Sequence, residues 1–218
     1  MKKDKSMQKL HLSNGYSQTK YFYFILFSIL FFTFLGCVGT QNTMTNQSGT
    51  PSGMLSQNTA TYRIGDTGPA GGIVFYDKGN SIGGWRYLEA APAETEVAAP
   101  THGTLYFSTD RRVGFGKENT EKYMDFFQQR GGGINTAPWL CNELNVNGFN
   151  DWYLPTTDEL LYMYNNLYSM EIGGLKNANY WSSFTGNNGI SYINFSDGSE
   201  QVTLWNIGNY QVRAVRRF

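Results

Sequence analysis

The sequence is poor in cysteine and histidine, with two residues of each among its 218. From position 38 onward only Cys141 and His102 remain, so this part of the chain can form no intrachain disulfide. It also has no histidine pair for zinc, and a Cys–His couple would have to use Cys141. Because Cys141 shares a predicted helical face with Ala137 and Leu140, we expect a buried, unreactive thiol.

The sequence also lacks an excess of positive charge. Lysine and arginine number 17, as do aspartate and glutamate, but five of the lysines lie in the first 20 residues. The part after position 37 keeps 12 basic and 16 acidic residues, a net charge near −4. Nucleic acids and anionic polymers need a clustered basic surface, so we expect no nucleic-acid partner. The basic clusters of the sequence are Arg111-Arg112 and the trio Arg213, Arg216 and Arg217.

The N-terminus combines a lysine-rich segment with an apolar run at 21–36, which Cys37 follows at once. This order is typical of a secretory signal. The junction Phe34-Leu35-Gly36-Cys37 resembles that of a bacterial lipoprotein signal, in which the cysteine becomes the lipidated first residue. The alternative is an uncleaved membrane anchor, although a run of about 16 residues is shorter than the ~20 that span a bilayer.

Both interpretations predict an exported domain held at the membrane. We expect a lipid-anchored protein of the cell envelope, at the outer membrane or the cell surface. Val38 is not the acidic residue that often signals retention at the inner membrane, but the choice between the two membranes stays open.

The chain after Cys37 divides into a tether and one domain. Residues 38–61 carry no charged side chain and consist mostly of Ser, Thr, Asn, Gln and Gly, which predicts a flexible polar linker. We therefore assign 1–37 to the signal, 38–61 to the linker and 62–218 to a folded domain, which is long enough for a real core.

The domain begins with a short apolar run typical of a buried strand, shows helical periodicity in its middle and changes to period two from Asn179 onward. Short strands are expected near the start, a loop at 91–112, then three helices, and finally a C-terminal antiparallel meander. Thr156 and Glu159 have the spacing of a capping box at the third helix. The fold class is therefore α+β. The predicted strands are 73–76, 85–90, 180–183, 190–195, 201–205 and 210–216, and the predicted helices are 117–130, 136–146 and 157–168.

Several motifs in order carry a family resemblance. They are IGDTGPAGGIVF at 64–75, GWRYLEAAP at 84–92, Gly114-x-Gly116-x-x-Asn119-Thr120, NGFNDWYLP at 147–155, DEL at 158–160, YWSS at 180–183 and VRAVR at 212–216. Together they resemble the C-terminal domain family of collagen-like bacterial adhesins, the Lcl C-terminal domain, within the C-type-lectin-like superfamily. The resemblance extends from about Ile64 to Phe218.

The resemblance implies a C-type-lectin-like fold with two to three helices and a binding role. The best-described relative is an adhesin for sulfated glycosaminoglycans, an activity that we do not transfer to this net-acidic chain. The family also implies a trimer as one oligomeric option. Lectin-like folds often carry calcium, so calcium stays open as a ligand, although no Asp, Asn or Glu run here has the spacing of a self-contained calcium loop. No other cofactor or metal is expected.

Most residues of these motifs have a structural interpretation. We expect Trp152, Leu154 and Trp181 in the core, Pro155 at the entry to the third helix, and Asp151 bonded to loop amides. Arg213 and Arg216 lie three apart on the last predicted strand, so they should face opposite sides of the sheet. One of them is expected to pair with a carboxylate such as Asp151 or Glu159.

The sequence favours a binding module over an enzyme. No acid, base, nucleophile or metal set is evident, since Asp158-Glu159 is explained by helix capping and the Gly114-x-Gly116 pair is a weak match to a phosphate loop. Sulfatase-modifying relatives of the superfamily use reactive cysteines that this chain does not supply. An enzyme is therefore the least favoured class.

The loops of the meander are rich in Asn, Gly and aromatic residues, which suits sugar recognition by stacking and hydrogen bonding. We predict a surface-exposed, non-catalytic domain that binds a glycan or a host matrix protein. The alternative is a structural or assembly lipoprotein of the envelope without a small ligand. The candidate ligand-binding residues are Asn187, Asn188, Tyr192, Trp205, Asn206 and Tyr210.

Overall fold

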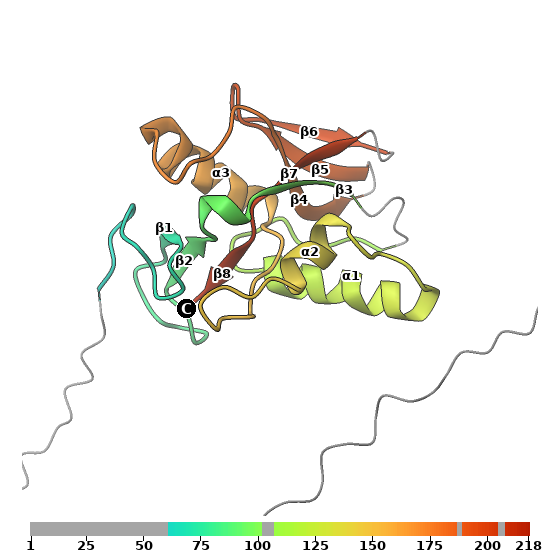
Figure 1. The fold of residues 1–218 in the computed structure, drawn as a ribbon, viewed down its shortest axis with the longest axis horizontal. Helices are drawn as coiled ribbons and strands as arrows, with labels where there is room; N and C mark the ends of the chain where they lie inside the picture. Colours follow the sequence, from blue (N-terminus) through green and yellow to red (C-terminus); the bar gives the residue numbers. More distant parts are fainter. Residues whose placement is uncertain (1–60, 102–106, 187–188, 205–207) are drawn as a thin grey trace, which may run out of the picture. The chain divides into compact units, whose positions relative to one another are not determined.

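The computed structural model describes residues 61–101, 107–186, 189–204 and 208–218. Within these residues the chain forms an α+β domain with two β-sheets, three α-helices and two short 3-10 helices (Figure 1). The predicted fold class, α+β, is confirmed at this level. The helices are α1 (Gly116–Arg130), α2 (Ala137–Asn142), α3 (Thr157–Asn166), η1 (Ala93–Thr95) and η2 (Tyr168–Met170).

The smaller sheet joins the beginning and the end of the domain. Its antiparallel strands follow the order β1 (Ile73–Asp77), β2 (Tyr87–Ala90) and β8 (Val215–Arg217). The approach of β1 to β2 explains one glycine of the GGIVF motif, because a Cβ on Gly72 would lie 2.2 Å from the Ala90 carbonyl oxygen. The backbone nitrogens of Arg86 and Tyr87 donate to the Phe218 carbonyl, which fixes the C-terminal residue against β2.

The larger sheet has five strands in the order β3, β7, β4, β5 and β6. The hairpin between β5 and β6 turns at Asp197-Gly198, where Gly198 has a φ of 74°, as the Asp-Gly step predicts. β4, β5 and β6 are consecutive antiparallel neighbours. The strand bounds are β3 (Val97–Pro100), β4 (Asn179–Gly186), β5 (Gly189–Asn194), β6 (Ser199–Thr203) and β7 (Asn209–Val212).

The predicted C-terminal meander is wrong beyond β6. β7 does not continue next to β6 but crosses to the other side of β4, where it pairs with β4 in parallel and with β3 in antiparallel fashion. The predicted strand 210–216 also divides into β7 and β8, which belong to different sheets. Arg213 and Ala214 connect them, so the expectation that Arg213 and Arg216 face opposite sides of one strand is wrong.

The predicted loop at 91–112 is wrong in its first part, which contains η1 and β3. β3 has the sequence VAAP and buries only Ala99 fully, whereas Val97 is exposed. A strand with so little alternation gives no sequence signal, because its place depends on β7, more than 100 residues away in the chain.

Two helices differ in length from their predictions. The predicted helix 136–146 ends after Asn142, because the chain turns at Asn147 and Gly148, both at positive φ, and bridges Val146 to Phe149. The predicted helix 157–168 ends at Asn166 and continues as η2. The capping box at its start is confirmed, since Thr156 and Glu159 exchange both side-chain-to-backbone hydrogen bonds.

Two hydrophobic clusters fill the domain. One packs α3, through Leu160 and Met163, against Tyr180 and Ile193 of the five-stranded sheet. The other contains Trp152, Leu154, Trp181, Ala137 and Cys141, and brings α2 to the sheet. The predicted burial of these two tryptophans, of Leu154 and of Cys141 is confirmed. Burial also raises the pKa of the Cys141 thiol, which keeps it protonated and unreactive.

Candidate functional site

The structure describes two of the six predicted ligand-binding residues. Tyr192 lies on β5 and Tyr210 on β7, so the expectation that they belong to loops of the meander is wrong. The other four positions lie outside the described residues. Those four are Asn187, Asn188, Trp205 and Asn206, and the predicted lipidation site Cys37 is also outside.

The two tyrosines meet over a buried tryptophan. The ring centroids of Tyr192 and Tyr210 are 4.7 Å apart, and those of Trp181 and Tyr210 are 4.3 Å apart. The Tyr192 ring meets Trp181 edge-on at 5.7 Å. Trp181 lies on β4 between them and is fixed by its indole N–H, which donates to the Ala99 carbonyl at 2.9 Å. Both tyrosines are half-buried, so a rigid aromatic base supports two rings that still reach solvent.

Amide side chains flank these rings on the same side of the sheet. In the strand register Trp181 pairs with Tyr192, which pairs with Gln201, and Asn179 pairs with Asn194. Residues paired in this way project to one face. Gln201 is exposed and the two asparagines are half-buried. We call this surface the aromatic face; it consists of Asn179, Trp181, Tyr192, Asn194, Gln201 and Tyr210.

The chemistry of the aromatic face is that of a neutral hydrogen-bonding surface. Burial raises the pKa of Tyr210, and a hydrogen bond with Tyr192 raises it further. The phenol therefore stays protonated at neutral pH and can both donate and accept. With the Asn and Gln amides, the face offers donors and acceptors around an apolar ring pair, an arrangement that suits a sugar with its apolar ring face and hydroxyl rim.

The predicted structural arginines each bind a buried carboxylate. Arg216 donates to both oxygens of Asp151, at 2.7 and 2.9 Å, and to Glu89 at 3.0 Å. The predicted pairing of an arginine with Asp151 is confirmed. The expectation that Asp151 binds loop amides is wrong, because among the described residues its hydrogen bonds come from Arg216 and not from a backbone N–H. Sequence reasoning missed Glu89, although a lone charge inside the apolar strand YLEA is a signal for a buried partner.

Arg213 has a different partner, Glu96. Their closest contact is 2.7 Å, and each side chain is only 1% exposed. Arg213 also donates to the carbonyls of Ala91, Gly173 and Gly174, so it connects three segments of the chain. Glu96 falls in the predicted loop, and no local pattern marks it as a core residue. These arginine clusters hold the fold together, and each contains one buried carboxylate oxygen that accepts no hydrogen bond from the described residues, Oε2 of Glu89 and Oε1 of Glu96.

Glu159 is buried at the start of α3 and receives backbone hydrogen bonds. Thr156 N and Gly114 N each donate to it at 2.8 Å. A Cβ on Gly116 would lie 2.6 Å from the Tyr153 ring and 2.7 Å from Glu159. The Gly114-x-Gly116 motif thus surrounds a carboxylate and leaves no space for a phosphate. Glu159 does not pair with Arg213 or Arg216, so the predicted ion pair of Glu159 with one of them is wrong.

Glu159 makes stability depend on pH. Burial raises its pKa from the ordinary 4.5 to about 7, so the folded state binds its proton more tightly than the unfolded chain does. The contribution of this bound proton to the free energy of unfolding is therefore fully present below pH 4.5 and is lost as the pH rises through about 7. We expect the free energy of unfolding to fall by roughly 3 kcal/mol from this group over that range.

Urea titrations at a series of pH values measure this slope. In Glu159→Gln the slope between pH 5 and about 7 should become shallower, although the variant is less stable at every pH because an amide nitrogen would face a backbone N–H. Some slope should remain, because burial also raises the pKa of Glu89. An equal slope in the variant and the unmodified chain would show that Glu159 is not the group that titrates.

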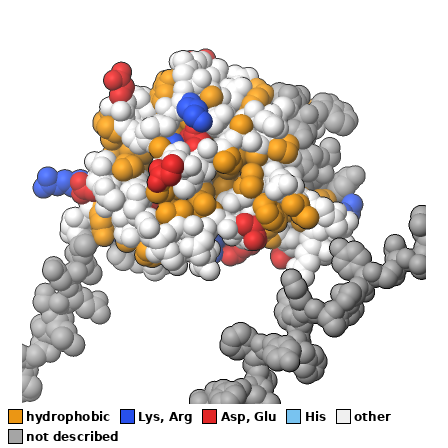
Figure 2. All heavy atoms as spheres, in the orientation of Figure 1, with side chains coloured by type: hydrophobic (Ala, Val, Ile, Leu, Met, Phe, Trp, Pro, Cys, Tyr) orange, Lys and Arg blue, Asp and Glu red, His pale blue; other side chains and the backbone are white. Residues whose placement is uncertain are grey.

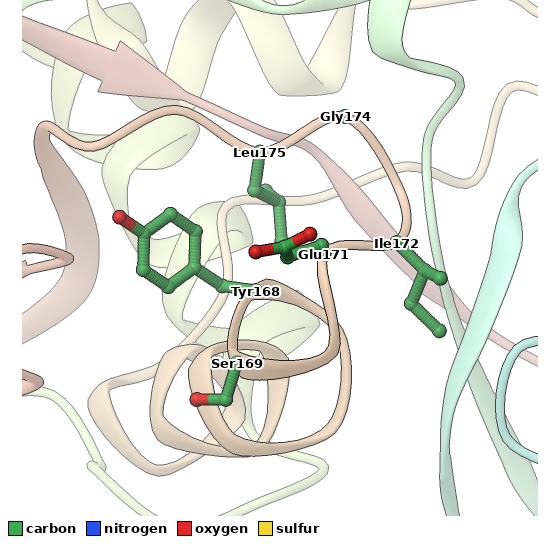
Figure 3. Close-up of a pocket in the computed structure, with 6 residues that line it drawn as sticks. All are labelled: Tyr168, Ser169, Glu171, Ile172, Gly174 and Leu175. Atoms are coloured by element: carbon green, nitrogen blue, oxygen red, sulfur yellow. The ribbon is translucent and has the colours of Figure 1, made fainter.

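A separate cavity lies beside η2 and the loop that follows it (Figure 3). It has a volume of about 420 Å³ and contains one charged side chain, Glu171. In Figure 3 the Ile172 side chain points away from the Tyr168 ring. A single exposed carboxylate provides no partner for acid–base chemistry. The lining residues are Tyr168, Ser169, Glu171, Ile172, Gly174 and Leu175.

Among the described residues, no group of three or more His, Cys, Asp or Glu side chains could hold a metal ion. Within the same ranges, each helix is too short or too polar to cross a membrane. A scan of the chain against protein-family models gives no match, and a search of the curated proteins gives no similar sequence.

Proposed function

We propose that this chain is an exported lipoprotein, anchored through Cys37, whose C-terminal domain binds a glycan without catalysing a reaction. The order of signal, Cys37 and uncharged linker supports the anchor. We assign the domain to the C-type-lectin-like superfamily and to the Lcl C-terminal family on the motifs at 64–75, 84–92, 147–155 and 180–183. The α+β architecture is compatible with that assignment.

The observation that carries the function is the aromatic face. Tyr192 and Tyr210 stand half-exposed on the buried Trp181, with amide side chains beside them. Aromatic rings bind the apolar face of a sugar, and Asn and Gln side chains donate to and accept from its hydroxyl groups. Because strands position the rings, the platform is formed before the ligand arrives, which lowers the entropic cost of binding.

The proposal predicts that the two tyrosines are needed for binding. The full chain in detergent micelles would be screened on an array of glycans and matrix proteins, with and without calcium. Tyr192→Ala and Tyr210→Ala should each weaken binding about tenfold, because each removes an aromatic contact worth ~1 kcal/mol together with its buried area. Tyr162→Ala is the matched control, since Tyr162 is an exposed tyrosine of α3 outside the aromatic face.

Equal losses in all three variants would mean that binding does not use the aromatic face. A blank array would contradict the glycan proposal and favour the second candidate, an assembly role in the envelope. One observation supports that candidate: β6 is the last strand of its sheet, and Val202 on it and Leu204 directly after it are 47% and 57% exposed. An exposed edge strand with apolar side chains can accept a strand from another protein.

A further inference from the structure

The aromatic face belongs to a sheet with almost no charge. In the five strands as the structure describes them, Glu200 is the one charged residue. Glu200 pairs with Ile193 in the register, so it projects to the side opposite Tyr192. There its carboxylate accepts from Ser191 and forms an ion pair with Arg111 at 3.1 Å. The strand residues that share a face with Tyr192 are therefore all uncharged.

Three cations close to the strands of this sheet form ion pairs with carboxylates. Arg111 binds Asp158 and Glu200, Arg213 binds Glu96, and Lys176 lies 3.2 Å from Glu96. The side of the domain displayed in Figure 2 has scattered acidic and basic side chains, separated by uncharged surface. A sulfated or otherwise anionic glycan needs several unpaired cations side by side. The aromatic face provides hydroxyl and amide groups in their place.

The ring geometry also limits what can stack there. The planes of Tyr192 and Tyr210 are inclined by 55° with centroids 4.7 Å apart. Two rings this close and this strongly inclined form one platform for a single sugar ring. A flat row of stacked sugars would need coplanar aromatic rings spaced along the chain.

We infer that the aromatic face binds an uncharged glycan through one of its sugar residues, and that sulfated glycans do not bind to this face. This inference rests on the proposed function and narrows it to a class of carbohydrate. The sugar ring lies against Tyr192 and Tyr210, and its hydroxyl groups bond to Asn179, Asn194 and Gln201.

Matched pairs of polymers test the inference. The full chain in detergent micelles would be titrated with dextran, mannan and the chitin hexamer, and with the sulfated form of each. We expect at least one uncharged member to bind about tenfold or more tightly than its sulfated form. That binding should be lost in Tyr192→Ala and should change little between about 50 and about 500 mM salt.

These titrations distinguish a wrong class of glycan from a complete absence of glycan binding. Binding of the sulfated forms alone, weakened by salt and by Tyr192→Ala, would overturn the inference and leave a glycan-binding face. Absence of binding to every polymer would overturn both. Gln201→Lys adds the cation that the face lacks, so this variant should gain affinity for the sulfated forms. No gain would contradict the placement of the ligand beside Gln201.

Discussion

Replacing Arg213 with methionine should lower the free energy of unfolding by about 3–5 kcal/mol, because it leaves Glu96 as a buried charge without its main partner. Both side chains are 1% exposed and 2.7 Å apart. Glu96 would keep a hydrogen bond from the Tyr180 hydroxyl at 2.9 Å and a contact at 3.2 Å with Lys176, a side chain that is 58% exposed. The change also removes the hydrogen bonds to the Ala91, Gly173 and Gly174 carbonyls. Urea denaturation of both proteins measures the difference.

Two further variants show whether the charge is the cause. Arg213→Met combined with Glu96→Gln should recover part of the loss, since the second change removes the unpaired charge. Arg86→Met is the matched control because Arg86 binds Asp77 at 2.8 Å, but both side chains are about one-third exposed. Its unfolding midpoint should stay close to that of the unmodified chain. If the single Arg213 and Arg86 variants were equally stable, the buried pair would not hold the segments together.

Replacing Trp181 with alanine should cost about 3–5 kcal/mol of unfolding free energy, the usual range for a fully buried aromatic residue. Trp181 is 1% exposed and packs against Tyr192 and Tyr210. The change would also leave the Ala99 carbonyl without the indole N–H that now donates to it. Thermal and urea denaturation measure the loss.

Trp139→Ala is the control for Trp181, because Trp139 lies on α2 and is only half-buried. Trp139→Ala should lower the free energy of unfolding by clearly less than Trp181→Ala does. Trp181→Phe should fall between the unmodified chain and Trp181→Ala, since it keeps an aromatic ring but removes the N–H. Trp181→Phe should also weaken glycan binding, because the base under Tyr210 moves. A Trp181→Ala variant as stable as the unmodified chain would mean that the tryptophan is not a core residue.

Local patterns in the sequence predict much of the fold. The Thr156–Glu159 capping box, the Asp197-Gly198 turn and the three helices depend on residues close together in the chain. Strand order depends on distant segments. The existence of β3 follows from its pairing with β7, more than 100 residues away in the chain. The position of β7 beside β4 follows from the pairing of Gln211 with Tyr180, and no local pattern in the sequence signals either contact.

The candidate site was predictable in type but not in composition. The aromatic and amide composition of the meander loops predicts Tyr192 and Tyr210 as ligand contacts, and the two rings lie together, although on strands and not in loops. The parallel pairing of β7 with β4 puts Tyr210 over Trp181, and the β5–β6 register brings Gln201 to the same face. A contiguous meander would have placed Tyr210 beside β6. Neither contact could be read from residue spacing alone.

The central claim is that the aromatic face binds a glycan, and calorimetric titration of a double variant tests it most directly. Tyr192→Ala with Tyr210→Ala would be compared with the unmodified full chain, using the uncharged polymer that binds best. We predict that the binding heat disappears in the variant. Trp181 should stay buried in the core, and the domain should still unfold cooperatively. Unchanged affinity in a folded double variant would contradict the claim.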